Sequence, residues 1–248
     1  MAKQVGPVHL RGQIGGIVFY VGPDGAGAKG ESGLTKERVM TAPEFAGSRR
    51  AGSAFGLSAK GGSLVRKGIG QRVKMLAETR MTGRMNKRIY AIIKSDSSTD
   101  MLDEKQIHKG DLKLLKGFSW HKDKPLTTAL LADYTVNIDR AAGLMEVRFA
   151  SFVPKRGLKA PEGATHFELF TAGMSANFEK MAVISAAASG GVMAINGRGT
   201  GSLELSCAVA TGGDLPLVLG LGILFYQEVG GKQRLLVEGS CFEIVGVA

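Results

Sequence analysis

The chain has 248 residues, 44% of them apolar, and a formal net charge of +10. This length can bury a hydrophobic core in one large or two small domains, and the composition excludes global disorder. The longest apolar run, residues 215–226, is broken by Pro and Gly and is too short to span a bilayer as a helix, so we predict no membrane span.

The first residues, 1–7, lack the apolar stretch of a secretory signal. We therefore expect synthesis in the cytoplasm, followed by incorporation into a particle or filament if the chain assembles; the sequence leaves the final location unknown. Two cysteines, Cys207 and Cys241, are too few for a disulfide framework, and we expect reduced thiols. A single bridge between them stays open, because both fall in predicted strands.

Residues 1–40 predict a β-hairpin arm. Apolar residues alternate with polar residues or Gly in 8–14 and 16–21, and a Pro-Asp-Gly turn follows at 23–25. Two or three short strands are unstable alone in water. The arm must therefore dock on its own chain or on another copy. We assign assembly contacts to its apolar residues, which are Val8, Leu10, Ile14, Ile17 and Phe19.

Residues 41–117 predict a basic helical segment, because the apolar period changes from two to three or four. A first helix includes residues 51–76 and is either broken near Gly61 and Gly62 or packed closely against a partner there. A second helix runs from Glu78 to Lys94. Residues 41–95 contain twelve Lys and Arg against two Glu, so this stretch alone carries a charge of +10.

Positive charge confined to one segment indicates a polyanionic partner, such as nucleic acid, or an acidic face on another copy. Phosphate contacts would make binding salt-dependent. Only three aromatic residues interleave with the basic ones, however, so stacking on bases is poorly supported. The candidate residues for either partner are Arg49, Arg50, Lys60, Arg66, Lys67, Arg72, Lys74, Arg80, Arg84, Lys87 and Arg88.

Residues 118–248 contain seven or eight short alternating segments separated by turns, which predicts an antiparallel β-sandwich, Ig-like or jelly-roll-like. Gly230 and Gly231 mark a two-residue hairpin. The fold class is therefore α+β, with the arm in 1–40, the helical segment in 41–117 and the sandwich in 118–248. We expect alternating apolar residues to form the sandwich core, among them Val147, Phe149, Leu169, Leu205 and Ile244.

The sequence indicates no catalytic residue, no metal ligand and no cofactor. Its four histidines are scattered, and none is paired with Cys, Asp or Glu at metal-ligand spacing. The glycine-rich stretches 22–30 and 196–201 lack the Lys-Ser/Thr ending and the following helix of a phosphate loop, so we interpret both as structural. The acidic residues between 96 and 111 match no calcium loop.

Three stretches, 12–20, 49–56 and 60–66, resemble the start of a group of uncharacterised proteins of unassigned function, chiefly from Bacteroidota. The resemblance covers roughly residues 1–95, implies no functional residues and favours a structural or mobile-element role over metabolism. We predict a non-enzymatic structural protein that self-assembles into a filament, tube, shell or virion-like particle. The alternative is a nucleic-acid-binding or packaging protein that uses the basic helical segment, and an enzyme ranks third.

Overall fold

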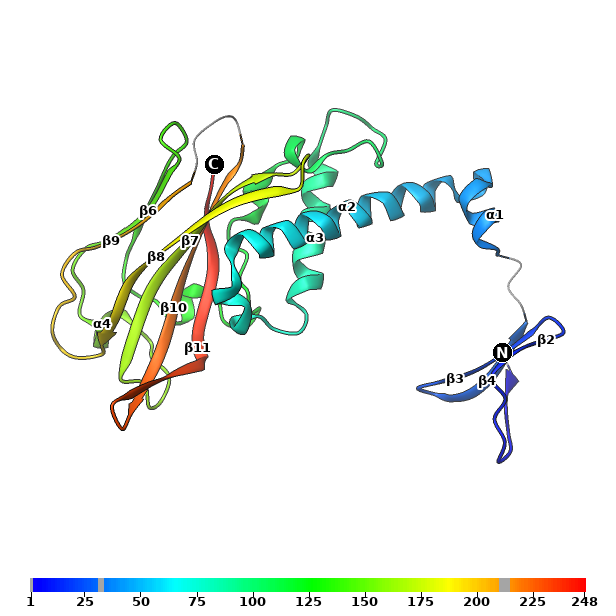
Figure 1. The fold of residues 1–248 in the computed structure, drawn as a ribbon, viewed down its shortest axis with the longest axis horizontal. Coiled ribbons are helices and arrows are strands. Elements are labelled where there is room, and N and C mark those ends of the chain that lie inside the picture. Colours follow the sequence, from blue (N-terminus) through cyan, green and yellow to red (C-terminus); the bar gives the residue numbers. More distant parts are fainter. Residues whose placement is uncertain (1, 31–33, 210–214) are drawn as a thin grey trace. The chain divides into compact units, whose positions relative to one another are not determined.

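A computed structural model describes residues 2–30, 34–209 and 215–248 (Figure 1). The chain divides into two compact units, an N-terminal unit of Met1–Arg49 and a C-terminal unit of Arg50–Ala248. Helices and antiparallel sheets are both present, which confirms the predicted mixed helix and sheet class. The division into three domains at 40 and 117 stays a prediction. Among the described residues, no helix is apolar and long enough to cross a membrane.

The N-terminal unit contains a four-stranded sheet of strand order β1-β4-β3-β2. Gly15 and Gly16 turn the chain between β2 and β3 with φ of +53° and +80°, a conformation that suits glycine in a two-residue hairpin. The predicted hairpin is thus present, but it belongs to a larger sheet. Its strands are β1 Ala2–Lys3, β2 Gly12–Ile14, β3 Ile17–Gly22 and β4 Gly25–Gly30.

The structure adds one strand to this unit and corrects one prediction. The glycine-rich stretch at 22–30 contains the strand β4, which the sequence did not predict. Val8 and Leu10 precede β2 and lie in no strand. The sheet is followed by the short helices α1 Lys36–Thr41 and η1 Pro43–Phe45.

Helix α2, Ala46–Ile69, crosses the boundary between the units, and α3 spans Met81–Ser95. Helix α2 is continuous at its glycine pair. A Cβ added to Gly61 would lie 2.5 Å from Ile107 Cδ1, and one added to Gly62 would lie 3.3 Å from Met85 Cγ. Of the two sequence alternatives, close packing is therefore correct. The remaining helices are short: η2 Gln71–Leu76, η3 Ile107–Lys109, η4 Leu112–Leu115, η5 Leu126–Thr128 and α4 Pro154–Gly157.

The C-terminal unit contains two antiparallel sheets. The larger has the order β11-β10-β7-β8 and the smaller the order β5-β6-β9. Gly230 and Gly231 join β10 to β11 with φ of +59° and +72°, which confirms the predicted hairpin. The strands are β5 Thr135–Asp139, β6 Leu144–Phe149, β7 His166–Asn177, β8 Ala182–Ala194, β9 Leu203–Ala208, β10 Leu217–Val229 and β11 Lys232–Val247.

The larger sheet is covered on both faces, with helices on one side and β6 and β9 on the other (Figure 1). Phe170 and Phe242 belong to the cluster on the helix side, whereas Leu169 belongs to the cluster shared with the smaller sheet. All five predicted core residues are buried. Ile244 nevertheless faces the helices rather than the smaller sheet. Cys207 and Cys241 are buried free thiols, so they do not form the bridge that the sequence left open.

The two edges of the larger sheet differ. The outer edge of β11 is covered at residues 242–244, because Trp120 N donates to Phe242 O and Ile244 N donates to Phe118 O, both at 3.0 Å. Strand β8 pairs with β7 alone among the described strands. It contains no charged residue and no proline, two of the devices by which sheet edges avoid pairing with another chain, but it has a third, a β-bulge at Gly190 and Gly191. Away from this bulge the outer edge of β8 is open.

Candidate functional site

The sheet of the N-terminal unit has one face that is apolar throughout. Residues paired directly across antiparallel strands share a face, and the pairs include Ile14 with Ile17, Phe19 with Ala28, and Val21 with Ala26. The opposite face carries polar residues such as Gln13 and Lys29. We name the first face the apolar arm face; its residues are Ala2, Gly12, Ile14, Ile17, Phe19, Val21, Ala26, Ala28 and Gly30.

The apolar arm face is exposed within its own unit. Ile14 is 64% exposed, Ile17 45% and Val21 43%. Among the described residues of Met1–Arg49, Gly27 alone is buried, so this unit has no hydrophobic core of its own. Contiguous apolar surface of this kind marks an interaction site in a folded protein. Three of the five predicted arm residues thus share one face, while Val8 and Leu10 are exposed outside it.

Four of the eleven predicted basic residues bind other parts of the chain. Arg72 forms an ion pair with Glu168, and its guanidinium lies 5.0 Å from the Phe170 ring. Arg84 donates to Glu78 Oε1 at 2.5 Å and to Ser119 O at 2.8 Å. These two arginines fasten the helical segment to the rest of the C-terminal unit. The other two residues are Arg49, which donates to the carbonyls of Val39 and Ala42, and Arg50, which pairs with Asp103.

The side chains of the other seven basic residues form no ion pair or hydrogen bond with the residues that the structure describes. Their charges are therefore free to act on a partner. They are Lys60, Arg66, Lys67, Lys74, Arg80, Lys87 and Arg88.

Three of these seven residues line one cavity of about 590 Å³. Arg66 and Lys67 come from the last turn of α2, and Lys74 comes from η2. Burial lowers the pKa of Arg66 below its usual value. We name this site the basic cavity; the lining residues used below are Ser63, Arg66, Lys67, Lys74, Thr82 and Trp120.

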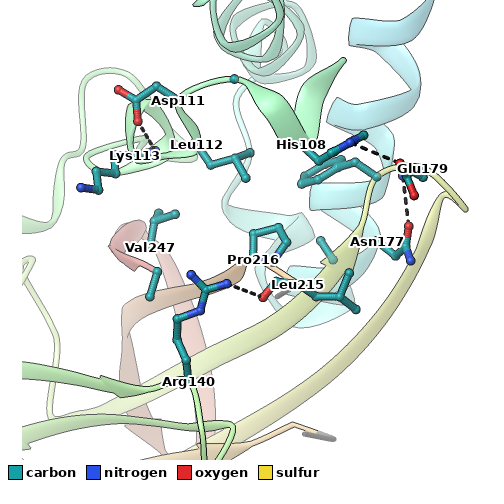
Figure 2. Close-up of a pocket in the computed structure, with 14 residues that line it drawn as sticks. His108, Asp111, Leu112, Lys113, Arg140, Asn177, Glu179, Leu215, Pro216 and Val247 are labelled. Carbon is teal, nitrogen blue, oxygen red and sulfur yellow. Dashed lines mark hydrogen bonds and ion pairs between the residues drawn. The ribbon is translucent and has the colours of Figure 1, made fainter. Parts of the chain in front are cut away.

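A second cavity, of about 540 Å³, lies among η3, η4 and the ends of β7, β10 and β11 (Figure 2). Several of its charged groups bind one another or the main chain. His108 Nε2 lies 3.2 Å from Glu179 Oε1, and Arg140 Nη2 donates to Leu215 O at 3.4 Å. No Ser, Thr or Cys is among the described residues that line it, so it offers no hydroxyl or thiol nucleophile.

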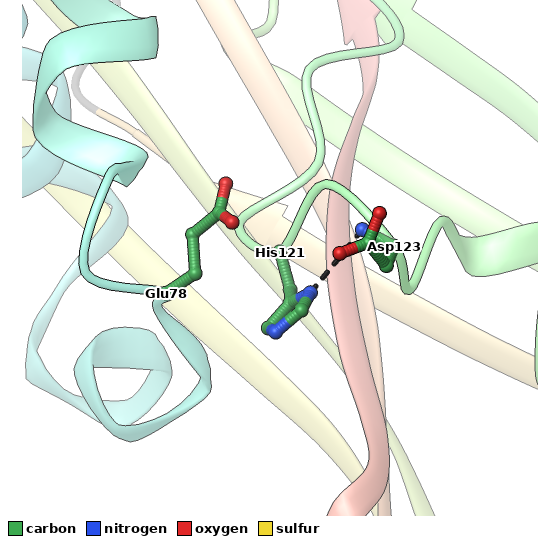
Figure 3. A group of neighbouring side chains, drawn as sticks. All are labelled: Glu78, His121 and Asp123. Atoms are coloured by element: carbon green, nitrogen blue, oxygen red, sulfur yellow. Dashed lines mark hydrogen bonds between the residues drawn. The ribbon is translucent and has the colours of Figure 1, made fainter.

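Glu78, His121 and Asp123 each bring one potential ligand atom within 4.8 Å of the others (Figure 3). Glu78 already binds Arg84, and His121 Nδ1 accepts from Asp123 N at 3.2 Å. Burial opposes ionisation of Glu78, but the hydrogen bond and charge of Arg84 outweigh it and lower its pKa. Arg84 lies against this carboxylate and repels cations. We therefore interpret Glu78, His121 and Asp123 as part of a hydrogen-bond network that holds the loop at 119–124 in place.

The predicted acidic connector has a structural role at Asp96. This carboxylate is 1% exposed and accepts hydrogen bonds from Gln106 N at 2.9 Å and Ser98 N at 2.8 Å. The bond from Gln106, followed by those from Ser98, lowers the pKa of Asp96 to about 2. Asp96 therefore holds the loop that follows α3.

No known protein family, curated protein or solved structure matches the chain. The likeness of residues 1–95 to the Bacteroidota group stays a prediction. Three features of the described residues therefore bear on function: the apolar arm face, the open edge of β8 and the basic cavity.

The sequence missed the basic cavity as a site, although part of its signal is present. Ser63, Arg66 and Lys67 lie at the three- and four-residue steps that share a helix face, so the sequence pattern could have grouped them. Thr82 and Trp120 come from other elements. No local pattern indicates that they meet the end of α2.

Proposed function

We propose that the chain is a non-enzymatic structural protein that self-assembles with further copies into a filament, tube, shell or virion-like particle. The exposed apolar arm face is the observation that supports this most directly. Its proposed occupant is a second copy of the chain. The C-terminal unit serves as the body of the subunit, and we propose that its two sheets form a β-sandwich of Ig-like or jelly-roll-like type.

The energetic reason lies in the size of the exposed side chains. Burying one large aliphatic or aromatic side chain contributes about 1.5–3 kcal/mol. Covering Ile14, Ile17 and Val21, which are 43–64% exposed, therefore contributes on the order of several kcal/mol. Because the N-terminal unit has no core, that contribution must come from a surface outside it.

A second copy can cover the apolar arm face, and each copy also has the open edge of β8 for a further contact. Strand β8 spans 13 residues, and the N–H and C=O groups that face outward on either side of its bulge are available for pairing. Each chain therefore has two different surfaces for contacts with other copies, the apolar arm face and the outer edge of β8. The surface that one copy uses can differ from the surface that its neighbour uses. Such head-to-tail contacts produce rings when the rotation closes and filaments when it does not.

The test uses two faces of one strand. Ile17→Asp and Phe19→Asp place a charge on the apolar arm face, whereas Val18→Asp places the same charge on the opposite face of β3. We expect Ile17→Asp and Phe19→Asp to yield monomers in analytical ultracentrifugation and to abolish particles in electron microscopy. Val18→Asp should assemble as the unchanged chain does.

Two outcomes would overturn the proposal. One is an unchanged chain that stays monomeric at about 100 µM, a concentration at which micromolar contacts are saturated. The other is equal disruption by Val18→Asp and Ile17→Asp, since the apolar face would then have no special role. A monomeric chain whose melting temperature falls in Ile17→Asp alone would instead indicate docking of the arm within one chain.

Nucleic-acid binding or packaging is the second candidate, and the seven basic residues without internal partners favour it. A suitable test variant replaces Arg80, Lys87 and Arg88 with Gln and leaves Arg84 in place, because Arg84 binds Glu78. The salt slope of DNA or RNA binding should fall by about 0.7–0.9 for each phosphate that the variant no longer neutralises. An unchanged chain that nucleic acid does not retain at about 50 mM salt would exclude this candidate.

A further inference from the structure

We propose that the basic cavity binds a phosphate group, carried either by a small phosphorylated molecule or by a nucleic-acid strand. The cavity lies within the C-terminal unit, where α2, η2 and the start of α3 meet. Phosphate binding at this site does not require assembly through the N-terminal unit.

Charge is the first reason. Arg66, Lys67 and Lys74 line the cavity, and none of them forms an ion pair with a described residue. Glu78 is the one carboxylate among the described lining residues, and Arg84 lies 2.5 Å from it. The cavity therefore carries an excess of positive charge. Phosphate oxygens are the acceptors that arginine and lysine bind in short, charge-assisted hydrogen bonds.

The second reason is an unsatisfied donor. Arg66 Nη1 is buried without a hydrogen-bond partner in the described part of the chain. A buried guanidinium N–H with no acceptor loses its hydration and gains nothing in return. Arg66 Nη1 and Asn86 Oδ1, which is also unpaired, both lie near Gly62, which is not among the lining residues. A turn of the Arg66 guanidinium toward the cavity lets an anionic oxygen there supply the missing acceptor.

The third reason is the shape and the remaining lining. A volume of about 590 Å³ falls in the range of about 300–1,000 Å³ that small-molecule sites occupy. The hydroxyls of Ser63 and Thr82 can donate to further phosphate oxygens. Met81 and Trp120 form an apolar wall, which suits the organic part of a phosphate ester. A phosphomonoester therefore fits better than inorganic phosphate alone.

Trp120 provides the measurement, because it is the single tryptophan of the chain. The full chain is titrated with adenosine 5′-monophosphate, inorganic pyrophosphate, adenosine and a short oligothymidylate, and Trp120 fluorescence is followed. We expect saturable changes with the phosphorylated probes and none with adenosine. Arg66→Gln and Lys74→Gln should each weaken binding about tenfold, whereas Lys232→Gln, on β11 and outside the lining, should leave it unchanged.

Lys74→Gln keeps the test valid if Arg66→Gln fails to fold, because Lys74 is exposed. The proposal is overturned if no phosphorylated probe gives saturable binding, or if Lys232→Gln weakens binding as much as Lys74→Gln does. Tighter binding of the oligothymidylate than of the mononucleotide, with a steeper salt dependence, assigns the phosphate to a nucleic-acid strand. The reverse order assigns it to a small molecule.

Discussion

Removing the guanidinium of Arg72 should destabilise the C-terminal unit through Glu168. This glutamate is 3% exposed on β7 and accepts hydrogen bonds from Arg72, Ser189 Oγ and Tyr226 Oη, the last at 2.7 Å. Burial opposes ionisation of Glu168, but the bonds from Ser189, Tyr226 and Arg72 together outweigh it and lower its pKa. Arg72→Met keeps the aliphatic stem and removes the positive charge beside the carboxylate.

We expect Arg72→Met to lower the free energy of unfolding by about 2 kcal/mol at pH 7. Breaking a fully buried ion pair costs about 3–5 kcal/mol, whereas a hydrogen bond to a charged group contributes about 1.5–3 kcal/mol. The Arg72 side chain is 42% exposed, so water replaces part of what it provides. In the variant, Ser189 and Tyr226 still donate to Glu168. The range for a hydrogen bond to a charged group, about 1.5–3 kcal/mol, therefore applies.

The loss should depend on pH. Because the pKa of Glu168 is lower in the folded chain than in the unfolded one, its ionisation stabilises the fold above the unfolded pKa of about 4.3. That contribution disappears as the pH falls through the folded pKa. Arg72→Met raises the folded pKa, so its effect should be largest at neutral pH and smallest once Glu168 is protonated.

Urea denaturation followed by circular dichroism measures the effect at neutral and acidic pH. The set comprises Arg72→Met, Glu168→Gln, the double variant, and Arg80→Met as a control, since the Arg80 side chain has no internal partner among the described residues. We expect the double variant to lose less than the sum of the single losses. Equal midpoints for Arg72→Met and Arg80→Met, or strictly additive losses, would refute the reasoning.

Three further predictions concern the cores. Phe149→Ala should lower the free energy of unfolding by about 3–5 kcal/mol, because Phe149 is 2% exposed; an unchanged urea midpoint would contradict this. Gly222→Ala should cost about 1–3 kcal/mol, since its Cβ would overlap the Phe170 ring, whereas Gly83→Ala, in open space on α3, should stabilise the chain. The thiol of Cys241, whose pKa burial raises to about 12, should react with a disulfide reagent only after unfolding, and rapid reaction in the folded chain would refute its burial.

Periodicity predicted the elements whose burial is regular. Met85 and Ile89 repeat at a helical step and are fully buried on α3, and the alternation around Val147 is that of a strand with one buried face. Strand β4 was missed because its sequence is almost entirely Gly and Ala, which carry no such alternation. Its close pairing with β3 requires those small residues: a Cβ on Gly27 would lie 2.7 Å from the Tyr20 ring.

The candidate sites were predicted less completely, because their partners are distant in the sequence. Charge alone placed Arg66 and Arg72 in one set, yet Arg72 pairs with a glutamate 96 positions away while Arg66 lines a cavity. No local pattern distinguishes these two roles. The apolar arm face was predicted in part, since Ile14, Ile17 and Phe19 alternate along one hairpin.

The unequal edges of the larger sheet set a limit on how many chains can join through it. Residues 117–120 occupy the outer edge of β11 at 242–244, so a new strand can pair along β8 without meeting them. If two copies pair β8 against β8, a two-fold axis relates them and each β8 edge is used once. Any assembly that uses this contact throughout contains an even number of chains.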